Sequence, residues 1–327
     1  MAAIKHNLPW IESPFFEKEL AESHLSDADK AFVKEFAENG YVIIDAGIED
    51  NTIEMIKKEL ATGFKDISEK VAAGKLSQQM LNRIQDAWQY NTHVRAVAGS
   101  QLIMDKLRLL YRREPFPFQT LNFNIGTQQR THSDMIHFSS IPERFMCGVW
   151  IAFEDITEDN GPLHYYPKSH KLPFYEMSDM NVKGSESRKM KNGYMDYCDY
   201  YENFIEAVAV NLKLEKKKLL VKKGQALIWA ANLLHGGEHI NDPNTTRHSQ
   251  VTHYYFQDCL YYTPLYSDIA IKEMYIRDVV NIIDGEPVKN RYLGEEVRVD
   301  TSTTWKRRLG KMLPKPIMSF YHSLTRK

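Results

Sequence analysis

The chain of 327 residues has little cysteine and no long apolar segment. Its three cysteines, Cys147, Cys198 and Cys259, are scattered and odd in number, which excludes a full disulfide framework and zinc-finger spacing. This usage is typical of a reducing cytosol, where thiols act as small core residues. No window approaches the roughly 20 apolar residues of a membrane-spanning helix. The first ten residues also lack the apolar core of a signal peptide. We therefore expect a cytoplasmic protein without a transmembrane segment.

The chain also lacks an excess of charge of either sign. Its 42 Lys and Arg residues nearly balance 43 Asp and Glu residues, for a formal net charge of −1. A general nucleic-acid binder would carry a basic footprint, so we expect no nucleic-acid partner. Apolar residues make up 43% of the chain, which is enough for a large core. Internal repeats and low-complexity segments are missing as well.

A pattern of possible metal ligands is present. His132 and Asp134 are two residues apart, so in extended backbone their side chains project from the same face. His235 follows about a hundred residues later. Two histidines and one carboxylate on one face of a divalent ion are typical of non-haem Fe(II) oxygenases. By itself, His-x-Asp is more often a surface hydrogen bond, so the sequence that follows it has to decide.

Three further motifs follow in order. They are the strand-like run Gly148–Phe153 with Trp150 at its centre, the turn Asn160-Gly161-Pro162-Leu163, and Tyr166-Pro167-Lys168-Ser169-His170-Lys171. Together with His132-Ser133-Asp134 and the distal His235, this order resembles the phytanoyl-CoA dioxygenase family of Fe(II)/2-oxoglutarate oxygenases. Lys168 stands where the family usually has a glycine, a departure at a turn position.

The resemblance implies a fold and an activity. The implied fold is mostly β with flanking helices, a double-stranded β-helix of the jelly-roll or cupin-like kind. His132, Asp134 and His235 would be the catalytic metal ligands for Fe(II), with 2-oxoglutarate as cosubstrate and O2 as oxidant. The implied reaction hydroxylates a C–H bond of a small-molecule or carrier-linked metabolite and releases succinate and CO2.

A candidate site for the cosubstrate lies after His235. The segment 246–256 alternates like a strand and places Arg247, Ser249 and His253 on one face. Arginine pairs with a carboxylate through two parallel, charge-assisted hydrogen bonds, and a hydroxyl two residues on can add a third donor. By resemblance, Arg247 and Ser249 bind the far carboxylate of 2-oxoglutarate. The alternative is that Arg247 forms a surface ion pair of small value.

Three other positions are candidates for the pocket wall. Trp150 is placed where the family commonly has a tryptophan near the cosubstrate, although a core role is equally compatible with the sequence. Gln129 is three residues before His132, where the family often has a pocket-lining residue. Asn122 lies in the alternating segment 119–125 and either faces a polar interior or lies at an exposed edge.

We expect a single oxygenase domain over residues 1–327. Residues 26–117 form its N-terminal helical and strand region, 118–264 the β-helix core with an insertion at 171–222, and 265–327 a helical and basic tail. Helices are predicted from Ser26 or Asp27 to Ala37, and over 51–64, 102–113 and 270–283. A strand is predicted over 41–44.

Two segments have open interpretations. The insertion 171–222 is rich in tyrosine and either covers the barrel mouth as a substrate lid or packs onto the barrel wall. Its lysines, at 216–218 and 222–223, form a solvated face or receive a phosphate or CoA tail. The basic residues after 301 pack on their own domain or contact an anionic membrane surface peripherally.

Two other functions compete with hydroxylation. The same iron centre could carry out desaturation, epimerisation or halogenation, although the presence of Asp134 argues against halogenation. The barrel could also be a catalytically silent binding protein. The complete set of ligands and the Arg247–Ser249 pair favour an enzyme. The sequence does not select the substrate or the oligomeric state.

Overall fold

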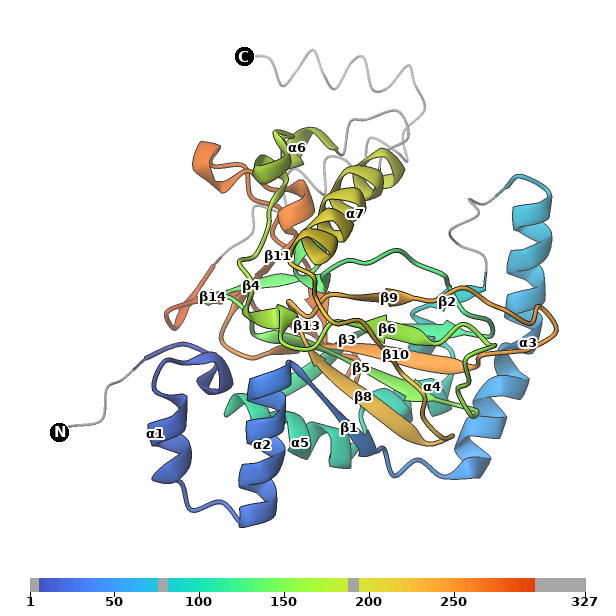
Figure 1. Ribbon diagram of the computed structural model, residues 1–327, viewed down its shortest axis with the longest axis horizontal. Helices are drawn as coiled ribbons and strands as arrows, with labels where there is room; N and C mark the ends of the chain where they lie inside the picture. Colours follow the sequence, from blue (N-terminus) through green and yellow to red (C-terminus); the bar gives the residue numbers. More distant parts are fainter. Residues whose placement is uncertain (1–5, 76–81, 188–193, 298–327) are drawn as a thin grey trace.

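A six-stranded antiparallel sheet forms the centre of the protein (Figure 1). The computed structural model describes residues 6–75, 82–187 and 194–297. Neighbouring strands of the sheet follow the order β1 (Tyr41–Asp45), β8 (Gln225–Ala230), β5 (Met146–Ala152), β10 (Ser249–Phe256), β3 (Pro115–Phe123) and β2 (Arg83–Gln85). Strand β10 therefore lies between β5 and β3, far from them in sequence and in the middle of the sheet.

Smaller sheets face this large sheet. One contains β7 (Lys217–Lys218), β6 (Leu163–Tyr165) and β9 (His235–Gly237), and another pairs β11 (Leu260–Tyr262) with β4 (Ser139–Ile141). Apolar side chains of β5, β8 and β10 form one buried cluster with Leu163 and Tyr165 of β6. The two layers thus share a core, as in a jelly roll, and the prediction of a mostly β fold with flanking helices is confirmed.

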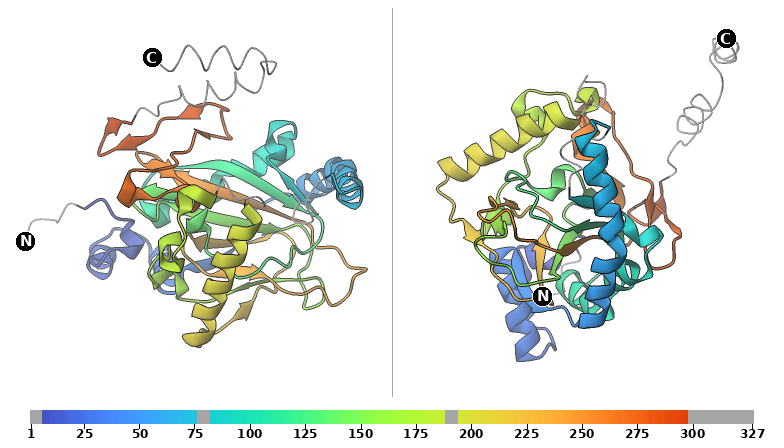
Figure 2. Two further views of the ribbon diagram at one scale, coloured as in Figure 1. Left: turned by 90° about the horizontal axis from the view of Figure 1, so that it is seen from above. Right: turned by 90° about the vertical axis from the view of Figure 1, so that its right-hand side faces the viewer.

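Helices cover the other face of the large sheet. They are α2 (Asp27–Asn39), α3 (Asp50–Ala72), α4 (Thr92–Ala98) and α5 (Gln101–Tyr111). The long helix α3 lies at one end of the sheet (Figure 2). Alternate residues of β5 enter the two cores, with Val149 and Ile151 packed against the helices and Trp150 in the inner cluster. Since both faces are covered, every residue of β5 is buried.

The start of the domain follows its local signals. Ser26 caps α2 by accepting a hydrogen bond from the backbone N–H of Asp29, and Gly40 ends the helix in the left-handed conformation (φ +80°). The predicted helix and the strand after it are therefore confirmed. The helices expected over 51–64 and 102–113 are also present, with α3 extending eight residues further. Before them, the chain forms η1 (Trp10–Glu12) and α1 (Phe16–Ala21).

Two expectations need correction or extension. The insertion at 171–222 contains η6 (Met177–Met180), α6 (Gly184–Ser187) and the long helix α7 (Tyr194–Asn211), which lies opposite α5 in Figure 1. The helix predicted over 270–283 is wrong. That region holds only η8 (Ile269–Ile271) and β12 (Val279–Val280), because its backbone pairs with a distant strand: the N–H of Arg277 donates to the carbonyl of Tyr261. The basic tail after 301 lies outside the described residues.

The remaining elements are short. They are η3 (Ala87–Gln89), η4 (Asp134–Ile136), η5 (Ser169–Lys171), η7 (Pro264–Tyr266), β13 (Pro287–Val288), β14 (Arg291–Tyr292) and β15 (Glu295–Glu296). Among the helices that the structure describes, none combines the length and the apolar character needed to cross a bilayer.

Candidate active site

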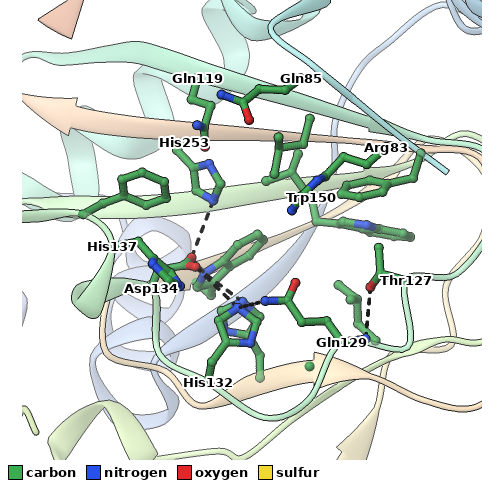
Figure 3. A pocket seen from close by; sticks show the side chains of 18 of the residues that line it. Arg83, Gln85, Gln119, Thr127, Gln129, His132, Asp134, His137, Trp150 and His253 are labelled. Atoms are coloured by element: carbon green, nitrogen blue, oxygen red, sulfur yellow. Dashed lines mark hydrogen bonds and ion pairs between the residues drawn. The ribbon is translucent and has the colours of Figure 1, made fainter. Parts of the chain in front are cut away.

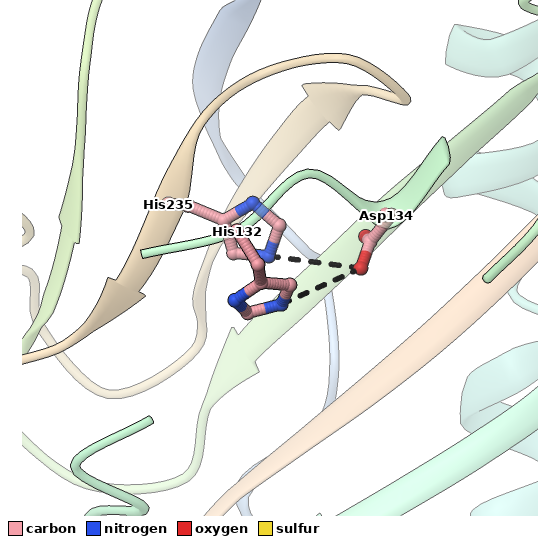
Figure 4. A group of neighbouring side chains, drawn as sticks. All are labelled: His132, Asp134 and His235. Carbon is pink, nitrogen blue, oxygen red and sulfur yellow. Dashed lines mark ion pairs between the residues drawn. The ribbon is translucent and has the colours of Figure 1, made fainter. Parts of the chain in front are cut away.

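The three predicted metal ligands meet at one point between the sheets (Figure 4). One ligand atom from each of His132, Asp134 and His235 lies within 4.8 Å of the others, and all three side chains are buried. The two histidines are brought together by a β-bridge in which each backbone N–H donates to the other's carbonyl, at 2.9 and 3.0 Å. Asp134 follows Ser133, which caps η4.

Each imidazole is oriented by a backbone carbonyl. The Nδ1 of His132 lies 2.8 Å from the carbonyl oxygen of Arg130, and the Nδ1 of His235 lies 2.9 Å from that of Leu233. These contacts favour the tautomer with the proton on Nδ1, which leaves Nε2 as a free lone pair facing the centre. Burial is the main cause that lowers the pKa of both imidazoles. The lowered pKa favours the neutral imidazole, the form that metal ligation requires.

The two oxygens of Asp134 have different neighbours. Its Oδ1 lies 3.8 Å from the Nε2 of His132 and 3.8 Å from that of His235. Its Oδ2 accepts a 2.8 Å hydrogen bond from the indole N–H of Trp229, and the Nε2 of His253 lies 3.6 Å away. Burial raises the pKa of this carboxyl group, but His235, His253 and His132 lower it more strongly, so the pKa lies well below its usual value. Oδ1 is left as the ligand atom.

The ring of Trp229 has room to reach Asp134 because the residue opposite it on the neighbouring strand is a glycine. Gly148 is opposite Trp229 in the β5–β8 pair. A Cβ at position 148 would lie 2.1 Å from the indole ring, closer than any real contact. The ring therefore lies over the glycine and reaches Asp134. The sequence places Gly148 in a strand-like run, but no motif marks this role of Trp229.

The donor set suits a ferrous ion. Two neutral imidazoles and one carboxylate converge on one side, which is the arrangement that non-haem Fe(II) oxygenases use. Three polar side chains buried together in a low-dielectric interior would cost folding free energy if no ion joined them. The residues therefore fit the metal that the sequence motif implied.

A cavity of about 340 Å³ opens beside the three ligands (Figure 3). Its volume is in the range of small-molecule sites, roughly 300–1,000 Å³. Trp150 and Arg83 lie on one side of it, and His137 and Asp134 on another. Asp134 is the one acidic residue among the described residues that line it.

Arg247 lines this cavity and is almost completely buried, with 1% of its surface exposed. Its Nε and Nη1 atoms have no hydrogen-bond partner among the described residues. Its guanidinium carbon lies 5.5 Å from the centre of the Trp150 ring. Burial lowers the pKa of Arg247 to about 10, so the side chain is still charged at neutral pH. A buried cation with orphaned donors fits a carboxylate ligand and does not fit a surface ion pair.

The other predicted pocket residues differ in position. Trp150 and Gln129 line the cavity, and the Nε2 of Gln129 lies 3.4 Å from the Nε2 of His132. Ser249 is not among the lining residues, although its Oγ is buried with no partner among the residues described. The functional roles of these three side chains stay predictions.

The pocket assignment of Asn122 is wrong. Its Nδ2 donates to the side chain of Gln250, which in turn donates to the carbonyl of Val94 in α4. The neighbouring Leu121 and Phe123 line the cavity instead. The alternation along β3 was read correctly, but Asn122 lies on the opposite face, beneath the helices, where its Nδ2 has a partner in Gln250 and its Oδ1 has none among the described residues.

The insertion contributes to the site from outside the cavity. Helix α7 carries Glu206, which accepts hydrogen bonds from Arg130 at 3.2 and 2.6 Å. Its Tyr201 is buried in a cluster with Ile136 of η4. The lysines at 216–218 and 222 form surface ion pairs, such as Lys216 with Glu238 and Lys222 with Asp155, and none of these four lines the cavity.

Comparison with known proteins agrees with this geometry. The sequence model of the phytanoyl-CoA dioxygenase (PhyH) family matches residues 36–249, more than half of the chain. No curated protein sequence matches significantly.

Several solved structures have a similar fold. The epimerase SnoN in complex with Fe3+, alpha ketoglutarate and nogalamycin RO is 14% identical, with a TM-score of 0.51, and the match covers 84% of this chain and 96% of that one. The carbocyclase SnoK is 16% identical, with a TM-score of 0.49 and coverage of 73% and 87%. EctD from S. alaskensis with 2-oxoglutarate and 5-hydroxyectoine is 16% identical, with a TM-score of 0.49 and coverage of 72% and 77%. At these identities only the likeness of fold to SnoN carries weight.

Proposed function

Since the chain belongs to the phytanoyl-CoA dioxygenase family, a family of Fe(II)/2-oxoglutarate-dependent oxygenases, we propose that it hydroxylates a C–H bond of a small-molecule or carrier-linked metabolite. Succinate and CO2 are the accompanying products. One observation carries the proposal: a two-histidine, one-carboxylate centre and a buried, unpartnered arginine line the same cavity.

His132, Asp134 and His235 would hold the iron. When bound, iron together with 2-oxoglutarate and dioxygen supplies the oxidising power that breaks the C–H bond. The protein supplies placement. The carbonyls of Arg130 and Leu233 fix the two imidazoles, and the Trp229 N–H fixes the carboxylate, so the ligand atoms keep their directions without the substrate.

Arg247 would bind the far carboxylate of 2-oxoglutarate. A cosubstrate there would supply acceptors for its two orphaned donor atoms and relieve the desolvation of its charge. Ser249 would add a hydroxyl donor. Trp150, which stacks near the guanidinium, and Gln129, beside His132, would wall the bound cosubstrate from water.

The finer structural predictions belong to the same proposal. The two facing layers would close as a double-stranded β-helix barrel, and residues 1–327 would form one oxygenase domain. We also propose a cytoplasmic location and a small-molecule substrate.

The test is an Asp134→Ala variant assayed for Fe(II) binding by anaerobic titration and for succinate formation. We expect loss of binding and turnover with the far-ultraviolet circular dichroism unchanged, because the variant removes a ligand that is not part of a strand. Asp66→Ala, on the exposed side of α3, is the control and should keep both properties. Undiminished turnover in Asp134→Ala would remove this residue from the mechanism.

Product mass separates the possible outcomes. A gain of one oxygen supports hydroxylation, a loss of two hydrogens indicates desaturation, and an unchanged mass with altered stereochemistry indicates epimerisation. No succinate with any substrate would indicate a binding protein.

A further inference from the structure

Three arginines line the active-site cavity: Arg83 and Arg247 lie near Phe123, and Arg277 lies apart from them. Arg277 belongs to the segment after the large sheet, beyond the residues 36–249 that match the family. Its guanidinium carbon lies 4.8 Å from the centre of the Phe138 ring and 5.7 Å from that of Phe118. Phe138 in turn lies 4.9 Å, between ring centres, from His253, the residue beside Asp134.

The position of Arg277 is fixed by its backbone. Its N–H donates to the carbonyl of Tyr261 at 2.9 Å, and its own carbonyl accepts from the side chain of Asn290 at 3.0 Å. Its Nη1 donates to the hydroxyl of Thr263 at 3.0 Å. The side chain is therefore held in place before any ligand arrives.

Part of the guanidinium has no partner. The Nε of Arg277 is buried and forms no hydrogen bond, and within the described ranges no carboxylate lies within ion-pair distance of the side chain. The hydroxyl of Thr263 accepts a hydrogen bond from Nη1, so the guanidinium edge formed by Nε and Nη2 remains available to a ligand. Such an edge offers two parallel donors, the geometry that a carboxylate accepts.

The cavity lining carries an excess of positive charge. Asp134 is the one acid that lines it within the described ranges, and its oxygens are directed at His132, His235 and Trp229. Arg83, Arg247 and Arg277 line the same cavity, and the described lining holds no further acid to neutralise them. One cosubstrate carboxylate at Arg247 would leave the charge of Arg277 uncompensated.

Arg247 and Arg277 lie at different ends of the cavity. Arg247 is near Phe123 and Trp150, whereas Arg277 is near Phe118 and Phe138. Phe118 and Phe123 are both in β3, five residues apart, which corresponds to roughly 15 Å along a strand. A single oxoacid bound at Arg247 and the metal would therefore not occupy Arg277.

We propose that Arg277 binds a carboxylate group of the substrate, so that the substrate class is an organic acid. This rests on the proposed oxygenase function and deepens it by naming what the second end of the cavity recognises. Phe118 and Phe138 would flank the salt bridge and shield it from water, and Thr263 would keep the guanidinium in orientation.

The experiment measures binding of matched probes to the enzyme loaded with Fe(II) and saturating 2-oxoglutarate, by anaerobic calorimetry. The probes are phenylacetate and phenylacetamide, hexanoate and hexanamide, and inorganic phosphate. They are titrated into the wild type, Arg277→Gln, Arg277→Lys and Arg113→Gln. The last is the matched control, because Arg113 also lies over a phenylalanine ring, that of Phe145, but does not line the cavity.

We expect at least one carboxylate to bind the wild type more tightly than its amide. Arg277→Gln should weaken that binding by about tenfold or more, since hydrogen bonds to a charged group are lost. Arg277→Lys should retain part of it, and Arg113→Gln should retain all of it. Binding of 2-oxoglutarate itself should be the same in all four proteins, which also shows that each is folded.

Other results overturn the proposal. Equal binding of acid and amide, no binding of any acid at millimolar concentration, or carboxylate binding that survives in Arg277→Gln would each do so. Phosphate as the one anion bound would overturn the assignment to a carboxylate. A wild type that fails to bind 2-oxoglutarate would refute the oxygenase function first, so the two failures are distinguishable.

Discussion

At the scale of single residues, the metal centre depends on a hydrogen bond between distant parts of the chain. Trp229 and Asp134 are 95 residues apart in sequence, and their 2.8 Å bond occupies the carboxylate oxygen that is not directed at His132 and His235. The bond leaves the other oxygen as a single ligand atom with a fixed direction. Groups that orient a metal ligand typically affect affinity by 10–100-fold when removed.

We therefore expect Trp229→Phe to lower the affinity for Fe(II) by about 10–100-fold, because the ring remains while the N–H donor is lost. Anaerobic metal titration measures this. Trp88→Phe is a close control: it removes a 3.2 Å hydrogen bond from an indole to Asp86 that lies outside the cavity. If both variants bind iron as tightly as the wild type, the bond from Trp229 has no part in ligand orientation.

The sequence predicted individual side chains well where a local motif defines them. His132 and Asp134 share a face by their spacing, and His235 was found through the order of motifs that follows them. Trp229 could not be assigned in this way, because its function depends on which strand faces η4 and on the space above Gly148. Asn122 was placed on the wrong face, since alternation gives two faces but does not say which one is the cavity when both are buried.

At the scale of secondary-structure elements, α7 supports the segment that carries the first ligand. The guanidinium of Arg130 donates two hydrogen bonds to the carboxylate of Glu206 in α7, and the backbone carbonyl of Arg130 faces the Nδ1 of His132. The hydrogen bond from Arg130 is the main cause that lowers the pKa of Glu206. Helix and ligand are thus connected through one residue, which makes Glu206 a candidate positioning residue.

We expect Glu206→Gln to weaken Fe(II) binding by up to about tenfold, less than loss of a direct ligand partner. The free energy of unfolding should change by only about 1 kcal/mol or less, because the ion pair is more than a third exposed on both sides. Iron titration and urea unfolding separate the two effects. Glu215→Gln removes a comparable exposed pair with Lys217 and serves as the control. Equal iron affinity in both variants would contradict a positioning role.

The elements themselves were predicted unevenly. Helix α2 and strand β1 have caps and a clear apolar pattern, so their positions follow from the sequence. Helix α7 lies in an insertion that was predicted either to cover the barrel mouth or to pack on the barrel wall, with no helix predicted. The region 270–283 has a helical pattern, yet its backbone bonds to residues 261 and 263. Long-range pairing of this kind outweighs local propensity and is not visible in a single sequence.

At the scale of the whole molecule, the fold holds a cation that it does not neutralise. Arg247 is buried with orphaned donors, and burial lowers its pKa to about 10. An unpaired buried charge destabilises a folded protein, so the ligand-free enzyme is less stable than its apolar packing would allow. A bound carboxylate would reverse that cost.

Arg247→Met should therefore have opposite effects in the two states. We expect the ligand-free variant to be at least as stable as the wild type in thermal unfolding. With 2-oxoglutarate at about 100 times its Kd, the wild type should gain about 2.7 kcal/mol, and the variant should gain nothing. Arg95→Met, which removes an arginine stacked on Trp88 outside the cavity, should keep the full gain. A variant that still responds to 2-oxoglutarate would rule out Arg247 as its anchor.

The residues proposed to bind iron and cosubstrate and the residue proposed to bind substrate lie in different parts of the chain, which has an evolutionary consequence. The iron ligands and Arg247 belong to the stretch that the family shares, whereas Arg277 is carried by the later segment, which pairs with β11 outside the large sheet. Changes in that later segment can alter which substrate the enzyme binds without disturbing the binding of iron and 2-oxoglutarate. Descendants of one ancestral oxygenase can in this way acquire new substrates while they keep the same iron and cosubstrate site.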